Sequence, residues 1–311
     1  MLSRLTVLML LIGLLGCANG ELRSGRAERC SMKPVDKLPL TTQLGLVAVP
    51  VQLNGRPFAM VLDTGAARTL IFSRVAAELQ LRADPQHQTS LFDLGGTSQR
   101  QNDVLFDRIA VGPKSFKLGH VPVIDIQRHD AMQPPLAGYL GADILGQFDL
   151  DLDLPHQRLT LWRVTGFTGD FIPWQEAHVS LVAGKSRNGW LILSVKLDGQ
   201  ELSGVLDTGA GGTAIMRDAA AARFGAAQGA HEQSRLPIRM VISQPIDGTL
   251  HRFRRFDVGP VRQINPAIMI ADAMLPDGDM LIAWPTLRQH RIWLSYATGQ
   301  VFIANTPVAG H

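Results

Sequence analysis

The hexapeptide Val-Leu-Asp-Thr-Gly-Ala occurs twice in this chain, at residues 61–66 and at residues 205–210. Its two aspartates, Asp63 and Asp207, are 144 residues apart. A repeat at this spacing constrains the fold strongly, because each copy must belong to a unit that folds in the same way. The chain has 311 residues, which is long enough for two such units with a core each.

The sequence before each aspartate predicts a β-hairpin. Asn54-Gly55 and Asp198-Gly199 each separate two strand-like apolar runs. These dipeptides favour the type I′ turn, which needs a positive φ at both central residues. Each aspartate is therefore expected just beyond the second strand of a hairpin. A short apolar stretch and then a helix-like segment follow in both copies.

The two halves match again at their ends. Residues 138–145 align with residues 280–287, and two strand-like runs follow in each case. The chain is therefore predicted to be mostly β, with two homologous lobes. The predicted boundaries are an N-terminal lobe at 41–163, an inter-lobe linker at 164–186, a C-terminal lobe at 187–304 and a tail at 305–311.

Residues 1–16 have the pattern of a signal peptide. Arg4 precedes an apolar run from Leu5 to Leu15 that is too short to span a bilayer. The Leu-Leu-Gly-Cys sequence that ends at Cys17 resembles the lipobox of bacterial lipoproteins, in which the cysteine is acylated and becomes the new N-terminus. An ordinary cleaved signal peptide followed by an incidental cysteine is the alternative.

Lipidation of Cys17 would make residues 17–40 a lipid-anchored linker, since this stretch is polar. Cys30 is then the only other cysteine, so no intramolecular disulfide is expected. The protein is expected outside the cytoplasm, on the periplasmic side of a bacterial membrane. Ala18 stands after Cys17, where an aspartate would resemble an inner-membrane retention signal, and this favours the outer membrane.

Two copies of one loop, related by a pseudo-twofold axis, would bring Asp63 and Asp207 together. Carboxyl groups held that close share one proton, so the pair offers a base and an acid at once. Such a pair can activate a water and protonate a carbonyl oxygen without a metal or a covalent intermediate. The glycine after each threonine permits a close approach of the loops, and the hydroxyls of Thr64 and Thr208 can bond across the interface.

These features resemble the aspartic proteases of the pepsin/retropepsin superfamily, and the Asp-Thr-Gly-Ala form is closer to the retropepsins. The resemblance covers about residues 41–304. It implies two retropepsin-like β-barrel lobes related by a pseudo-twofold, with the active cleft between them. It also implies that Asp63 and Asp207 are the catalytic residues of an endopeptidase. Both lobes lie in one chain, as in pepsin, so a monomer that acts on protein or peptide substrates is expected.

The resemblance also assigns the residues around the two aspartates. The superfamily packs two apolar residues and a glycine beneath each active loop, and Tyr139-Leu140-Gly141 match this pattern. The second lobe departs from it, because Ala283 stands where the superfamily has glycine. The residues expected to support the active loops are Thr64, Gly65, Ala66, Thr208, Gly209 and Ala210. Neither Gly-Thr turn contains a tyrosine, and the flap over the site is assigned to Gly95, Gly96, Thr97, Gly248 and Thr249.

Several other functions are not supported. The net charge of +3 is too small to predict nucleic-acid binding. The nine histidines show no ligand spacing with cysteine or glutamate, so no metal and no cofactor are expected. Asp149, Asp151 and Asp153 alternate on a predicted strand and are expected to line a solvated face. The alternative function is a catalytically inactive, periplasmic binding lipoprotein of the same fold, because a fold does not fix an activity.

Overall fold

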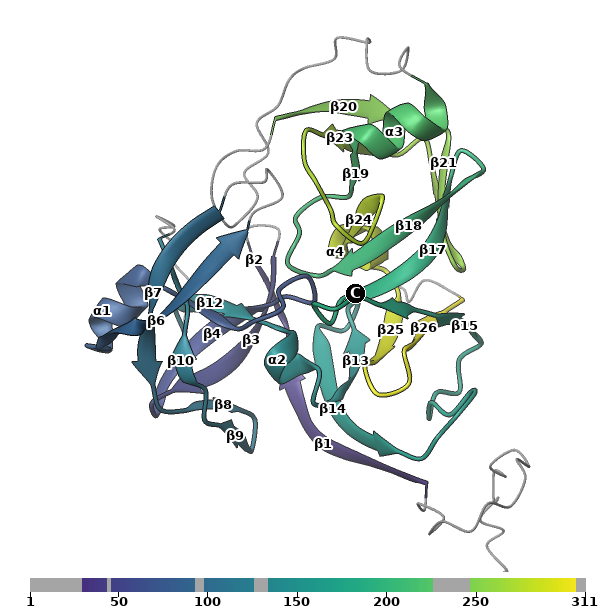
Figure 1. Ribbon diagram of the computed structural model, residues 1–311. Helices are drawn as coiled ribbons and strands as arrows, with labels where there is room; N and C mark the ends of the chain where they lie inside the picture. Colours follow the sequence, from purple (N-terminus) through teal and green to yellow (C-terminus); the bar gives the residue numbers. More distant parts are fainter. Residues whose placement is uncertain (1–29, 44–45, 93–97, 126–133, 226–246, 306–311) are drawn as a thin grey trace, which may run out of the picture.

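The computed structural model describes residues 30–43, 46–92, 98–125, 134–225 and 247–305. Strands dominate it, and they form two lobes that share one sheet. Figure 1 shows the N-terminal lobe at the left in purple to blue and the C-terminal lobe at the upper right in green to yellow. The expected signal peptide, Cys17 and the Gly95-Gly96-Thr97 turn lie outside the described residues. Within the described ranges, none of the helices has the length and apolar character needed to cross a membrane.

The N-terminal lobe is built on a curled eight-stranded sheet in the order β11-β5-β12-β4-β3-β8-β9, with β2 paired to β3. Its strands are β2 (Thr41–Gln43), β3 (Leu46–Leu53), β4 (Arg56–Leu62), β5 (Leu70–Phe72), β8 (Ile109–Val111), β9 (Lys114–Phe116), β11 (Val123–Ile124) and β12 (Leu136–Leu140). Two short helices, α1 (Ser73–Glu78) and α2 (Ala142–Leu145), follow β5 and β12. A separate three-stranded sheet, ordered β10-β7-β6, contains β6 (Ala83–Phe92), β7 (Ser98–Phe106) and β10 (Gly119–Val121).

The C-terminal lobe repeats this plan in a nine-stranded sheet, ordered β20-β23-β19-β24-β18-β17-β21-β22, with β16 paired to β17. Its strands are β16 (Gly184–Lys185), β17 (Leu191–Leu197), β18 (Gln200–Asp207), β19 (Ala214–Met216), β20 (Gly248–Arg252), β21 (Arg255–Val258), β22 (Val261–Ile264), β23 (Ala267–Ala271) and β24 (Met280–Ala283). The helices α3 (Arg217–Phe224) and α4 (Trp284–Leu287) follow β19 and β24. The predicted mostly-β fold with two similar lobes is confirmed.

The hairpins predicted before the two aspartates are also confirmed. The strands β3 and β4 pair antiparallel, as do β17 and β18. The four turn residues all have positive φ, at 48° and 84° for Asn54 and Gly55 and at 47° and 86° for Asp198 and Gly199. In each lobe a later strand, β12 or β24, runs parallel to the strand that leads to the aspartate and antiparallel to the short strand after it. This arrangement places each aspartate at the end of a strand whose neighbours are fixed on both sides.

A six-stranded sheet joins the lobes in the order β1-β14-β13-β25-β26-β15. The central neighbours β13 and β25 come from different lobes and pair antiparallel over five residues, with Asp151 opposite Trp293. The strands are β1 (Ser31–Pro39), β13 (Asp149–Asp153), β14 (Arg158–Thr165), β15 (His178–Val182), β25 (Arg291–Ser295) and β26 (Gln300–Ala304). In Figure 1 they lie below the point where the two lobes meet.

This sheet corrects three expectations. Residues 31–39 were assigned to the lipid-anchored linker, but they form the strand β1. This strand pairs with β14 along the whole length of β14. Residues 164–186, assigned to the inter-lobe linker, contain the end of β14 and the strands β15 and β16. The aspartates of β13 do not line a solvated face either. Asp149 and Asp151 are each 2% exposed, because Asp149 accepts a hydrogen bond from Trp293 and Asp151 pairs with Arg291.

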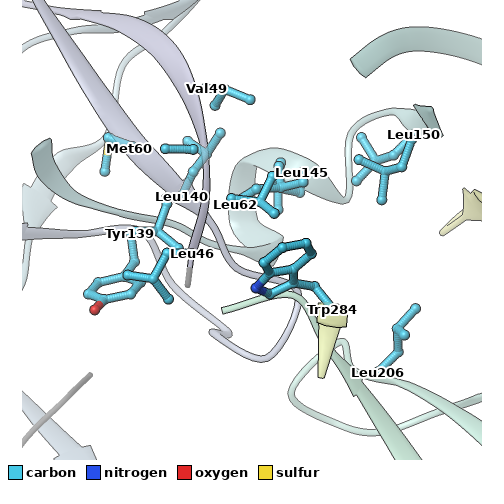
Figure 2. Close-up of a cluster of buried hydrophobic side chains, with 14 of the residues drawn as sticks. Leu46, Val49, Met60, Leu62, Tyr139, Leu140, Leu145, Leu150, Leu206 and Trp284 are labelled. Carbon is cyan, nitrogen blue, oxygen red and sulfur yellow. The ribbon is translucent and has the colours of Figure 1, made fainter. Parts of the chain in front are cut away.

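One hydrophobic cluster runs from lobe to lobe beneath the active loops. Figure 2 shows Trp284 of α4 beside Leu46 and Leu62 of the N-terminal lobe, with Leu206 close by. Leu62 and Leu206 directly precede the two Asp-Thr-Gly loops and are at most 1% exposed. Because protein interiors are close-packed, this shared core fixes how the strands that carry the aspartates approach each other.

Candidate active site

The two Asp-Thr-Gly loops meet where the lobes join. Asp63 directly follows β4, and Asp207 is the last residue of β18. Each loop turns back on its own aspartate, because the backbone N–H groups after the aspartate need acceptors once the strand ends. Asp63 Oδ1 accepts hydrogen bonds from Gly65 N and Ala66 N, both at 2.9 Å, and Asp207 Oδ1 accepts one from Gly209 N at 2.9 Å. Each carboxylate is therefore held in a fixed orientation by its own loop.

The glycines of the loops let the aspartates come together across the pseudo-twofold. A Cβ atom added to Gly65 would lie 2.5 Å from Cγ of Asp207, and one added to Gly209 would lie 2.4 Å from Cγ of Asp63. Each glycine thus packs directly against the carboxyl group of the opposite loop, in a space that no other residue fits. The two carboxyl groups are close enough for each to change the pKa of the other.

Thr64 and Thr208 tie the loops together with reciprocal hydrogen bonds. The backbone N–H of each donates to the hydroxyl of the other at 3.1 Å. Each hydroxyl in turn donates across the interface, Thr64 Oγ1 to Leu206 O at 2.7 Å and Thr208 Oγ1 to Leu62 O at 2.6 Å. Both threonines are fully or nearly fully buried. Their N–H and hydroxyl groups therefore make hydrogen bonds to the opposite loop in place of hydrogen bonds to water.

Burial and proximity change the ionisation of both aspartates. Removal from water raises the pKa of Asp63 well above its usual 3.8, and the neighbouring charge of Asp207 raises it further. Burial also raises the pKa of Asp207, to about 6, although the N–H groups of Gly209 and Ala210 partly oppose this. Two such carboxyl groups titrate as one unit, and a single shared proton is the favoured state between the two steps.

The two lobes support the loops with the same hydrogen bond in spite of the alanine in the second lobe. Thr69 Oγ1 accepts from Gly141 N, and Thr213 Oγ1 accepts from Ala283 N, both at 3.1 Å. A Cβ at Gly141 would lie 2.5 Å from the backbone carbon of Arg68, whereas the methyl group of Ala283 is accommodated in a fully buried position. The second lobe therefore has alanine in place of the glycine and still keeps the hydrogen bond from Ala283 N to Thr213, which follows its active loop.

Arg68 connects the first active loop to the hairpin formed by β6 and β7, a role that the sequence analysis did not assign. Its guanidinium donates to Thr89 Oγ1 at 2.8 Å and to His120 O at 3.1 Å, and it lies 3.5 Å from Asp103 Oδ2. Gly95, Gly96 and Thr97, which were assigned to the flap, lie between these two strands in the sequence and outside the described residues. The motif spacing carried no signal for this contact, because Thr89, Asp103 and His120 are distant in sequence.

Three further residues differ from what the sequence predicted. Gly248 and Thr249 were assigned to a flap turn, but the structure places them as the first two residues of β20, paired with β23. Tyr296, in the turn after β25, was assigned no part in the site. Its hydroxyl is buried and makes no hydrogen bond to the described residues, and burial and then the charge of Asp63 raise its pKa. Tyr296 is therefore a buried polar group that is close enough to Asp63 to respond to its charge.

A profile of the family described as aspartyl protease matches residues 49–144 and 193–286, so that each matched segment contains one Asp-Thr-Gly-Ala loop. The chain belongs to the aspartyl protease family. The resemblance seen in the sequence is thus confirmed, and the repeat is a duplication of the family's own unit.

Two solved structures resemble this aspartyl protease family member. The aspartic proteinase from Irpex lacteus has 13% sequence identity with it and a TM-score of 0.50, with 89% of this chain and 98% of that chain covered. Basic 7S globulin from soybean has 8% identity and a TM-score of 0.48, with 90% of this chain and 96% of that chain covered. The likeness to the Irpex lacteus enzyme concerns the fold alone. A comparison with curated proteins found no match.

Proposed function

We propose that this protein is an aspartic endopeptidase in which Asp63 and Asp207 hydrolyse peptide bonds. The observation that carries the proposal is the packing of Gly65 and Gly209 against the opposite carboxyl groups, which brings the two carboxyls close enough to change each other's pKa. Two aspartates that merely occupied similar turns would not need glycine at both of these contacts. Family membership and fold agree with this function.

The chemistry follows from one proton shared by two carboxyl groups. The ionised carboxylate removes a proton from a water molecule, and the oxygen of that water bonds to the carbonyl carbon of the substrate. The protonated carboxyl group donates its proton to the carbonyl oxygen, which gives a tetrahedral diol. The carboxyl group that now carries a proton donates it to the amide nitrogen as the carbon–nitrogen bond breaks, and the other carboxylate takes a proton from a hydroxyl of the diol, which becomes the carbonyl group of the acid product. The pair therefore ends with one shared proton again. Neither a metal nor a covalent intermediate takes part.

The test is replacement of each aspartate by asparagine, which keeps the shape and removes the acid–base function. Asp63→Asn and Asp207→Asn should each abolish peptide hydrolysis, and the double variant should lose no more than either single one, because the two residues act as a unit. Circular dichroism should show an unchanged fold. A statine-type peptide, which mimics the tetrahedral diol, should inhibit the wild type.

The alternative is a binding protein that has kept the fold without the activity. It would be favoured if the wild type bound peptides but did not cleave them at any pH. Cleavage by the Asp207→Asn variant as fast as by the wild type would instead show that the aspartate pair is not the catalytic machinery. Either outcome would contradict the proposed endopeptidase.

We also propose that the protein acts as a monomer on the periplasmic side of a bacterial membrane, anchored through lipidated Cys17. The support for this is the signal-like segment and the Leu-Leu-Gly-Cys sequence. The wild type should fractionate with membranes, and Cys17→Ser should appear in the soluble fraction or remain unprocessed. Soluble wild-type protein would remove the anchor and leave the peptidase proposal intact.

A further inference from the structure

The strand β6 contains a large bulge that brings two histidines to one aspartate. Between Asp84 and Gln88 the strand advances four residues, while its partner β7 advances one, from Asp103 to Asn102. Pro85 has no N–H group and fits such an interruption of the ladder. Gln86 N donates to Asp84 Oδ1 at 3.0 Å, so the chain turns around the carboxylate and returns His87 to it.

His120 reaches the same carboxylate from another strand. It lies in the centre of β10, opposite Leu105 of β7. The Nδ1 atoms of His87 and His120 lie 2.8 Å and 3.0 Å from Asp84 Oδ2, and the two imidazole rings are stacked with their centroids 3.7 Å apart. The three donor atoms, one from each residue, are all within 4.8 Å of one another.

Only one of the two histidines in this cluster makes a hydrogen bond to Asp84 through its Nδ1 atom. His87 Nδ1 makes a hydrogen bond to Asp84 Oδ2. His120 Nδ1 is buried from solvent and lies at a similar distance, but it makes no hydrogen bond of acceptable geometry to a described residue. This ring nitrogen therefore lies beside the Asp84 carboxylate without a hydrogen-bond partner among the described residues.

We propose that Asp84, His87 and His120 form a binding site for a divalent transition-metal ion of the zinc type. Two imidazoles and one carboxylate are a donor set that suits zinc and its neighbours, whereas magnesium and calcium prefer oxygen ligands alone. Ligand atoms in a tetrahedral zinc site are about 3.3 Å apart, given bonds of about 2.0–2.1 Å. The observed separations of 2.8 Å and 3.0 Å need only a small expansion to reach this value.

The ion would leave a position for water, because the side chain of His87 is 52% exposed and that of His120 is 33% exposed. Its ligands come from β6 and β10, which both pair with β7 but not with each other. A bound ion would therefore close the base of the β6–β7 hairpin. His120 O also accepts a hydrogen bond from Arg68, five residues after Asp63, so the site is linked to the first active loop.

The experiment uses the full chain without a histidine tag, stripped with a chelator and titrated with zinc chloride by calorimetry. We expect one zinc ion per chain at this site and a rise in Tm of several degrees, because an ion that binds only the folded state stabilises it. His87→Gln, His120→Gln and Asp84→Asn should each weaken binding by about 10-fold or more, since even outer-shell partners of metal ligands are worth about 10–100-fold. Magnesium chloride should produce neither effect.

His156→Gln is the matched control. His156 also lies three residues after an aspartate, with Nδ1 2.7 Å from Asp153 Oδ1. Among the described residues, however, this pair is not part of a group of three possible metal ligands. Its replacement should leave zinc binding unchanged. The cobalt-loaded wild type should show the intense visible absorption of a tetrahedral site, and His87→Gln, whose side chain is largely exposed, should lose it without unfolding.

The proposal is overturned if the wild type binds no zinc, or if zinc binding survives in all three ligand variants. It is also overturned if His156→Gln weakens binding as much as His87→Gln does. None of these measurements depends on peptidase activity, so the metal site and the proposed function stand or fail separately.

Discussion

The ionisation of Asp63 and Asp207 depends on what each carboxyl group touches. Aspartic proteases of the pepsin type commonly have serine or threonine after the glycine, where a hydroxyl can stabilise the ionised carboxylate. Here Ala66 and Ala210 occupy both positions, and burial raises the pKa of both aspartates without a hydroxyl to oppose it. The singly protonated pair therefore persists to higher pH than it would with serine at these positions.

The pH dependence of hydrolysis tests this account. The acidic limb of the pH–rate profile should lie near pH 6, the value to which the pKa of Asp207 is raised, with an optimum in mildly acidic to near-neutral conditions. Ala66→Ser or Ala210→Ser adds a donor to the ionised form, which lowers the pKa and should move the acidic limb to lower pH. Ala67→Ser, one residue further along and exposed, should leave the profile unchanged. A wild-type optimum as acidic as that of pepsin would contradict the role of the alanines.

The glycines offer a second test at the scale of single residues. Gly65→Ala and Gly209→Ala each place a methyl group within about 2.5 Å of the opposite aspartate. The carboxyl groups must then separate, and we expect peptide hydrolysis to fall about 100-fold or more, because a misplacement of about 1 Å can cost that much. Gly212→Ala is the control, since its added Cβ meets nothing within 4 Å. Equal activity of Gly65→Ala and Gly212→Ala in a peptide-cleavage assay would argue against contact between the carboxyls.

The two active loops act together through their threonines. Thr64 and Thr208 each leave a buried N–H and a buried carbonyl without a partner when the hydroxyl is removed. Thr64→Val and Thr208→Val should therefore each lower the free energy of unfolding by about 1–3 kcal/mol, and the double variant should lose less than the sum.

Urea unfolding followed by tryptophan fluorescence measures these changes. Thr298→Val serves as the control, because the hydroxyl of Thr298 is buried but has no hydrogen-bond partner among the described residues. Its removal should be neutral or stabilising. Strict additivity of the two loop variants would show that the loops are held independently of each other.

At the scale of the whole molecule, the six-stranded sheet makes the two lobes one cooperative unit. Arg291 of β25 and Asp151 of β13 join them by two hydrogen bonds, at 2.9 Å from Nε and 2.7 Å from Nη2. Asp151 is 2% exposed, so loss of the arginine would leave a buried carboxylate without its partner. The lobes are therefore expected to unfold in a single transition.

Arg291→Gln should lower the free energy of unfolding by about 3–5 kcal/mol, which is typical when one member of a buried ion pair is removed. Arg262→Gln is the control, because Arg262 pairs with Asp257 at the surface with 60% of its side chain exposed, and its loss should cost less than about 1 kcal/mol. Both variants should still unfold in one step, with loss of peptidase activity and of tryptophan fluorescence at the same urea concentration. Two separate steps would show that the shared sheet does not couple the lobes.

The sequence by itself determined the features that depend on neighbouring residues. The turn dipeptides Asn54-Gly55 and Asp198-Gly199 need positive φ wherever they occur, and so the hairpins and the strand ends that carry Asp63 and Asp207 could be predicted. The duplication then implied two similar lobes. The turn dipeptides act on neighbouring residues, and the duplication is visible as a repeated sequence. Both can therefore be recognised without knowing which distant segments pack together.

Only the tertiary structure decided which distant segments meet. Residues 31–39 form β1 because β14 offers an unpaired edge, and Asp151 is buried because Arg291 arrives from the other lobe. Asp84 and His120 are brought together by a bulge and a third strand, which no spacing in the sequence reveals. The physical reason is that a strand pairs through backbone groups that every residue has, so the partner of a strand is selected by the packing of the whole molecule.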